Sequence, residues 1–266
     1  MKKLIAISSF LFISSILFSQ EIKQIQGAKG RYIISGEVSE EAARQKALAE
    51  AKVDALKKAG VAENIQSYDM LFKSEIGDKY EEVFMSDKQS EIRGAVQDYT
   101  MQFEKGIDEF KNFYVEVTIN ANVILYKTSA DPAFDAVIDG IKQGYKNGDK
   151  LSFTIKPTID CYLTIFNIFE KDAALTYPNP WENQIKFEGG KTYKFPQNSQ
   201  ILDYPLEKST KEPEKNKMIF VFTKDLIPYI KYSGDDQITT FEDISSWIFS
   251  ISPDKRKSHY VPFVIF

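Results

Sequence analysis

The side chains that most often perform nucleophilic or metal chemistry are scarce in this chain. Its 266 residues include a single cysteine, Cys161, and a single histidine, His259. One of each cannot assemble a His/Cys zinc site, a disulfide framework or the ligand set of an iron–sulfur cluster. A Cys161–His259 pair is a conceivable nucleophile and base, but Cys161 lies in an apolar, strand-like run that favours an inert buried thiol. We therefore predict no catalytic residues, no metal site and no cofactor.

Two further patterns give only weak support for a catalytic or nucleotide-binding site. Gly190-Lys191-Thr192 imitates the end of a phosphate-binding P-loop, but the full motif needs a glycine where the chain has Ile185. It also needs a following helix, whereas residues 193–196 have a strand-like pattern that ends in proline. The 38 acidic residues guarantee carboxylate pairs by chance, so a hydrolase that uses two carboxylates stays open as an alternative.

One loop is a better candidate for a binding site. Residues 177–183 read Tyr-Pro-Asn-Pro-Trp-Glu-Asn and place two aromatic rings and two amides in a proline-stiffened segment. Rigid aromatic side chains lose little entropy when they contact a ligand. The candidate ligand-binding residues are Tyr177, Asn179, Trp181 and Asn183. The alternative, which we favour, is a loop folded over the edge of its domain with Trp181 as a plug.

The N-terminus has the layout of a secretory signal peptide. Lys2 and Lys3 precede an apolar run, residues 4–18, and polar residues follow from Gln20. Fifteen helical residues span about 22 Å, which is short of the roughly 30 Å hydrocarbon core of a membrane. We predict cleavage between Ser19 and Gln20, a periplasmic or extracellular location, and no transmembrane segment in the mature chain. No cysteine lies directly after the apolar run, so a lipoprotein acylation site is missing.

Charge and composition describe a folded, acidic protein. Hydrophobic residues make up 43% of the chain and charged residues 27%, as in globular proteins. The net charge is −4, and removal of residues 1–19 with their two lysines leaves 32 basic and 38 acidic residues, net −6. We expect no nucleic-acid partner, because binding to phosphates requires a basic surplus.

The first half of the chain predicts an α+β domain over residues 20–127. A strand is expected at 31–38, followed by a helix at 40–59 with Ser39 as N-cap and Gly60 as C-terminal stop. Small residues at three- and four-residue steps suit this helix to close packing on a sheet. Strands are expected at 95–103 and 113–125, and the second alternates strictly between apolar and polar residues. Residues 62–90 show no clear pattern.

The second half predicts a mainly β, sandwich-like domain over residues 134–266, joined by a polar linker at 128–133. A helix is expected at 133–145 and another at 239–250. Residues 207–217 form a charged loop that we expect to be solvated. Proline, glycine and asparagine residues lie between the predicted strands. These strands are 150–156, 161–169, 173–177, 191–195, 218–223 and 260–266.

The second half also resembles the bacterial domain-of-unknown-function family 4384. The resemblance rests on residues 148–153, on 160–166 with its Tyr-Leu-x-x-Phe pattern, on the Leu-x-Tyr-Pro-Asn turn at 175–179, and on 183–185 and 190–196. It covers about half of the chain and implies a secreted or appended module without an assigned activity. The first half resembles the N-terminal module of flagellar assembly protein T and related envelope lipoproteins, through residues 42–59, Gly94 and the strands at 95–125.

These features predict an exported, non-catalytic binding or assembly module of the cell envelope. Its partner would be an envelope protein or a cell-wall component, and its oligomeric state is open. The alternative is an envelope hydrolase whose carboxylate pair the sequence does not identify.

Overall fold

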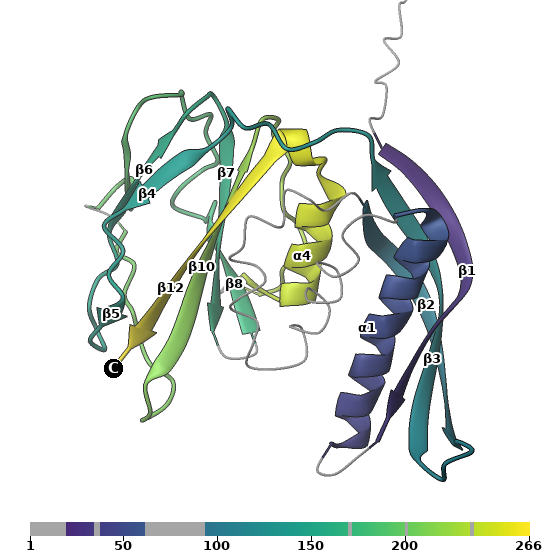
Figure 1. Ribbon diagram of the computed structural model, residues 1–266. Helices are drawn as coiled ribbons and strands as arrows, with labels where there is room; N and C mark the ends of the chain where they lie inside the picture. The colour runs from purple at the N-terminus through teal and green to yellow at the C-terminus, as the bar shows by residue number, and fades with distance from the viewer. Residues whose placement is uncertain (1–19, 35–37, 62–93, 170–171, 200–201, 235–236) are drawn as a thin grey trace, which may run out of the picture.

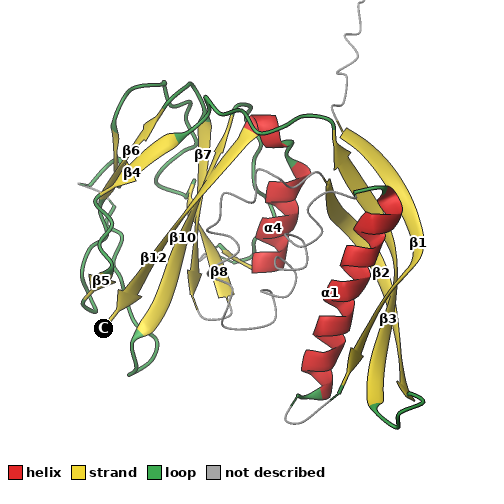
Figure 2. Cartoon of the chain, in the orientation of Figure 1, coloured by secondary structure: helices red, strands yellow, loops and turns green. Residues whose placement is uncertain are grey.

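The computed structural model describes residues 20–34, 38–61, 94–169, 172–199, 202–234 and 237–266 (Figure 1). The predicted signal peptide at 1–19 and the whole segment at 62–90, which showed no clear pattern, lie outside these residues. Strands dominate the described part of the chain, which has two α-helices (Figure 2). The predicted α+β class is therefore confirmed. Neither described helix combines the length and the apolar character that a membrane crossing needs.

The first unit is one helix on a three-stranded antiparallel sheet of order β1-β3-β2. Its strands are β1 (Gln20–Ile33), β2 (Gly94–Ile107) and β3 (Phe113–Tyr126), and α1 (Glu40–Ala59) lies along the sheet (Figure 1). The predicted strand at 31–38 had the wrong bounds. The real strand begins at Gln20, because pairing with β3 along its length outweighs the mixed polar pattern of its first half.

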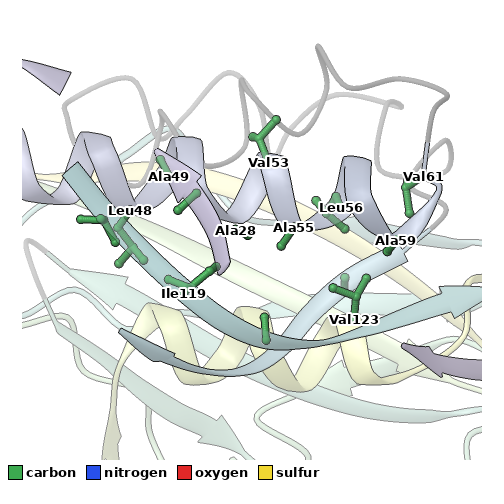
Figure 3. Packing of buried hydrophobic residues seen from close by; sticks show 14 of the residues in the cluster. Ala28, Leu48, Ala49, Val53, Ala55, Leu56, Ala59, Val61, Ile119 and Val123 are labelled. Atoms are coloured by element: carbon green, nitrogen blue, oxygen red, sulfur yellow. The ribbon is translucent and has the colours of Figure 1, made fainter. Parts of the chain in front are cut away.

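Local signals correctly fixed both ends of α1. The Ser39 Oγ accepts a hydrogen bond from the Ala42 N–H (3.1 Å), and Gly60 ends the helix at φ +94° with its N–H donated to the Lys57 carbonyl (3.0 Å). The small residues of the helix face the strands, and Figure 3 shows Leu56 and Ala59 on that side beside Val123. This stripe lets the sheet backbone come close to the helix.

The alternation predicted for 113–125 is confirmed in the middle of β3 but breaks near the end of the strand, where Ile124 is buried and Leu125 is partly exposed. Val115, Val117, Ile119 and Val123 are fully buried beneath α1 and join the same apolar cluster. Phe113, at the start of the strand, is exposed.

The second unit contains a six-stranded sheet of order β11-β8-β7-β10-β12-β5, in which only the β12–β5 pair is parallel, and a three-stranded sheet of order β4-β6-β9. The strands are β4 (Ala136–Asp139), β5 (Gly144–Tyr145), β6 (Phe153–Pro157), β7 (Tyr162–Phe169), β8 (Asp172–Tyr177), β9 (Tyr193–Phe195), β10 (Glu214–Thr223), β11 (Ile238–Thr239) and β12 (Arg256–Ile265). All six strands predicted for this half are present, with shifted ends.

Two apolar clusters cover the two faces of the six-stranded sheet. One includes residues of β6 and β9 together with the inward side chains of β7, β10 and β12, such as Phe153, Phe195 and Phe220. The other packs the opposite face against α4 (Phe241–Ser250) through Phe166, Trp247 and Ile248. The predicted helix at 239–250 is thus confirmed as α4, which begins two residues later with Thr240 as its N-cap.

The predicted helix at 133–145 was wrong. This segment forms β4 and β5, with Gly140 at φ +95° between them. Phe134, Val137, Ile138 and Ile141 have helical spacing, but Val137 is 63% exposed while Ala136 is buried, as in a strand. Pairing of β4 with β6 satisfies the backbone hydrogen bonds that a helix would have made internally.

The charged loop at 207–217 is not simply solvated, because β10 begins at Glu214. The Glu214 carboxylate is buried and accepts hydrogen bonds from the Thr210 N–H (2.5 Å) and the Ser209 Oγ (3.1 Å). Burial acts to raise the pKa of Glu214, but the hydrogen bonds from Thr210 and Ser209 hold it below its ordinary value.

Helix α4 touches both units. Its Phe249 belongs to the apolar cluster beneath α1, whereas its Ile244 and Ile248 belong to the cluster on the six-stranded sheet. The Tyr126 hydroxyl, at the end of β3, donates to the Phe249 carbonyl. The division into separately folding domains at 128–133 stays a prediction.

Candidate functional site

A pocket of about 330 Å³ opens beside the loop that the sequence singled out. Its apolar lining includes Leu151, Leu175, Met218 and Phe263 from the strands and the segments next to them. Its rim includes Asn179 and Trp181 from the predicted loop, together with residues 202–206. Ligand pockets of this size typically combine an apolar floor with a few placed polar groups.

Hydrogen bonds to the Asn179 side chain give the loop its shape. Its Oδ1 accepts from the backbone N–H groups of Trp181 (3.0 Å) and Glu182 (2.9 Å). Its Nδ2 donates to the Thr176 carbonyl (2.9 Å) and to a Glu182 carboxylate oxygen (3.0 Å). Asn179 therefore stiffens the loop, and its side-chain donors are already used inside the protein.

Glu182 holds the loop in place, a role that sequence reasoning missed. Its carboxylate is 3% exposed and accepts from Asn179, from the backbone N–H of Gln197 (2.5 Å) and from the Tyr204 hydroxyl. Burial, followed by the hydrogen bond and charge of Glu182, raises the pKa of Tyr204, so this phenol remains a donor. The carboxylate thus ties the loop to residues 202–206 across the rim, a contact between segments that no local pattern could reveal.

Tyr177, rather than Trp181, plugs the core. Tyr177 is fully buried, and its hydroxyl donates to the Asn183 carbonyl (2.9 Å) and accepts from the Ile185 N–H (3.2 Å). Burial is the main reason that the pKa of Tyr177 rises to about 12. The favoured interpretation of Trp181 as a plug was wrong, since this side chain is 65% exposed. Of the four predicted residues, Asn179 and Trp181 line the pocket, and Tyr177 and Asn183 lie outside its lining.

Two polar side chains of the lining are hydrogen-bond acceptors. The Asn167 Oδ1 is buried without a hydrogen-bond partner, while its Nδ2 donates to the Asn216 Oδ1 (2.9 Å). The Asp203 carboxylate is about half exposed and pairs with the Lys150 ammonium (2.7 Å), which is itself well exposed.

The structure does not bring Cys161 and His259 together as a nucleophile and base. Cys161 is buried in the core between the two sheets, and burial raises the pKa of its thiol to about 12. The thiol therefore stays protonated and covered at neutral pH. The His259 Nε2 instead lies 2.7 Å from the Asp135 Oδ1. Burial lowers the pKa of His259 despite the opposing pull of Asp135.

The segment that imitates a P-loop is a turn before a strand. Gly190 has φ +78°, and its N–H donates to the Pro157 carbonyl (2.7 Å). Lys191 pairs with Glu188 (2.6 Å), and β9 follows where a P-loop has a helix. Among the described residues, no three metal-ligating side chains gather in one place.

Comparison with protein families gives a match in the second half of the chain. Residues 144–224 match the model of the family DUF4384, a domain of unknown function. No curated protein matches the chain. The matched residues run from β5 to the end of β10 and include the whole loop at 177–183 and the segment at 202–206. The expected resemblance of the second half is therefore confirmed, and the candidate pocket lies mainly in the part of the chain that is similar to DUF4384.

Proposed function

We propose that the protein is an exported, non-catalytic binding or assembly module of the cell envelope whose partner contacts the pocket beside Trp181. One observation carries this proposal: a loop stiffened by its own hydrogen bonds holds a large indole ring exposed at the rim of a pocket. A preorganised loop loses little entropy on binding, and an aromatic ring offers much contact area. Tyr177 and Glu182, which belong to the same loop, are buried and hold the loop by hydrogen bonds.

The hydrogen bonds of Glu182 and the ion pair of Asp203 favour a binding function over hydrolysis. Glu182 accepts three hydrogen bonds from protein donors, so its oxygens are occupied and cannot readily take a proton from water. Asp203 is exposed and paired with Lys150. Turnover of peptidoglycan, peptide or glycan by the pure protein, lost when one acidic residue is changed, would overturn the non-catalytic assignment in favour of a hydrolase.

Replacement of Trp181 by alanine is expected to separate binding from stability. Loss of an exposed aromatic contact should weaken capture of the partner from envelope extract by about 2 kcal/mol, roughly 30-fold. The melting temperature should barely change, because the indole buries little surface in the protein itself. Quantitative mass spectrometry of captured proteins and muropeptides, together with a thermal melt, measures both effects.

Ile230→Ala is the matched control, because Ile230 is another exposed apolar side chain and does not line the pocket. The control should retain every captured component. Equal recovery of all components by Trp181→Ala and Ile230→Ala would contradict the proposed site.

Export forms part of the same proposal and has its own measurement. The basic, apolar and polar order of residues 1–22 is the layout of a cleaved signal peptide. We expect intact-mass analysis of the protein from its native envelope to place the N-terminus between residues 18 and 23. Recovery from that fraction of a chain that keeps Met1 would refute export with cleavage. An assembly role for the first half rests on its resemblance to the module of flagellar assembly protein T.

A further inference from the structure

The atom of the Asn167 side chain that lacks a hydrogen-bond partner is its Oδ1, and the neighbours of Asn167 fix this orientation. The Asn167 Nδ2 donates to the Asn216 Oδ1 (2.9 Å), and the Asn216 Nδ2 donates to the Glu214 carbonyl (3.5 Å). Rotating the Asn167 amide would set two oxygens against each other, and rotating both amides would oppose an oxygen to the Glu214 carbonyl. Asn167 therefore contributes a buried acceptor without a partner to the pocket lining. Such a group is favourable only when a ligand or water donates to it.

The lining holds a second acceptor that suits a donor. The Asp203 carboxylate lies at the same pocket, whereas the donors of Asn179 and Tyr204 already bind Glu182. An anionic ligand would face Asp203 and the Asn167 oxygen.

The aromatic ring of Trp181 and the apolar floor of the pocket also fit a cation that is carried on an aliphatic stem. The exposed Trp181 ring can attract a cation over its face, and Leu151 and Met218 can cover methylene groups. The Lys150 ammonium on Asp203 demonstrates that this carboxylate accepts a cation. Because both partners are well exposed, a ligand can displace Lys150 at little cost.

We propose that the pocket beside Trp181 takes a basic side chain, lysine or arginine, from a partner protein. The aliphatic stem lies on the apolar floor, the Trp181 ring covers the stem and the charged head, and the head donates to Asp203 and Asn167. This inference rests on the proposed function, because it names the chemistry of the ligand at the same site.

Titration of the full-length protein with short blocked peptides tests the inference. The probes are acetyl-Gly-Lys-Gly-amide and its arginine, citrulline and norleucine analogues, followed by NMR through the Trp181 indole N–H and the Asn167 side-chain amide. We expect millimolar binding of the lysine and arginine peptides, with the citrulline and norleucine peptides about 10-fold weaker. Equal binding of lysine and norleucine would overturn the inference.

Two rim variants sharpen the test without touching the core. Asp203→Asn should weaken binding of the lysine peptide about 5-fold, and Lys150→Ala should tighten it about 3-fold by removing the competing ammonium. Asp225→Asn, which breaks the exposed pair with Lys255, is the matched control and should change nothing. If Asp203→Asn and Lys150→Ala also leave binding unchanged, the assigned role of Asp203 is wrong.

The remaining outcomes separate this inference from the proposed function. Binding of 1,5-diaminopentane without binding of the lysine peptide would overturn a protein side chain as the source of the cation. Perturbation of the Trp181 indole by chitotriose alone would overturn the cation and leave the binding pocket standing. Failure of every probe, together with partner capture that does not depend on Trp181, would refute both.

Discussion

Gly30→Ala is expected to lower the free energy of unfolding by about 3 kcal/mol, because β1 and α1 leave no room for a side chain there. A Cβ at Gly30 would lie 2.1 Å from the Ala47 carbonyl oxygen and 2.4 Å from the Ala51 nitrogen. Both atoms belong to the helix backbone, so no rotamer change can relieve the overlap. The strand is held by continuous pairing with β3 on both sides of Gly30, and it cannot move away without breaking that register.

Gly27→Ala is the matched control on the same strand. Gly27 also has its own backbone requirement, φ +63°, but a Cβ there would meet no atom within 4 Å. We expect a loss of about 1 kcal/mol from the left-handed conformation alone. Chemical denaturation followed by far-UV circular dichroism measures both variants. Equal losses at the two positions would mean that the contact between Gly30 and α1 is looser than the structure indicates.

The sequence predicted best those elements whose signals are local. The Ser39 side chain and the αL glycine at Gly60 fix the ends of α1 by contacts within four residues. The alternation of apolar and polar residues in β3 reflects one buried face and one more exposed face. The same type of signal failed at 133–145, where helical spacing of apolar residues was satisfied by a strand. Phe134 is buried in the core, but Val137 is exposed to solvent.

The candidate site could be predicted only in part, because its decisive contacts join residues far apart in the chain. The loop at 177–183 stood out by composition, and Asn179 and Trp181 do line the pocket. The sequence could not show that Tyr177 is buried while Trp181 is exposed, because both are large aromatic residues in one short segment. The partners Glu182 and Tyr204, and Asn167 and Asn216, meet only after the strands pair.

Arg256→Met is expected to destabilise the protein by about 3 kcal/mol, because Arg256 joins the two halves at the end of α4. Its buried guanidinium donates to the carbonyls of Ile248 and Ile251 (2.8 Å to the latter). The last turn of α4 has no basic residue of its own, so Arg256 supplies the cation that the C-terminal end of a helix favours. Methionine keeps the apolar contacts of the stem but leaves these carbonyls without their donor.

The same guanidinium lies over the rings of Tyr126 (5.5 Å) and Phe249 (4.9 Å), so the variant should also loosen the first unit. Burial raises the pKa of Tyr126, which keeps its hydroxyl protonated as the donor to the Phe249 carbonyl. Hydrogen exchange should therefore speed up in α4 and at the end of β3 together. Lys255→Met is the control, because Lys255 is exposed and pairs with Asp225 at the surface, a contact worth about 0.5 kcal/mol. If Arg256→Met speeds exchange in α4 alone, the halves are coupled through the chain connection rather than through this residue, as two separately folding domains would require.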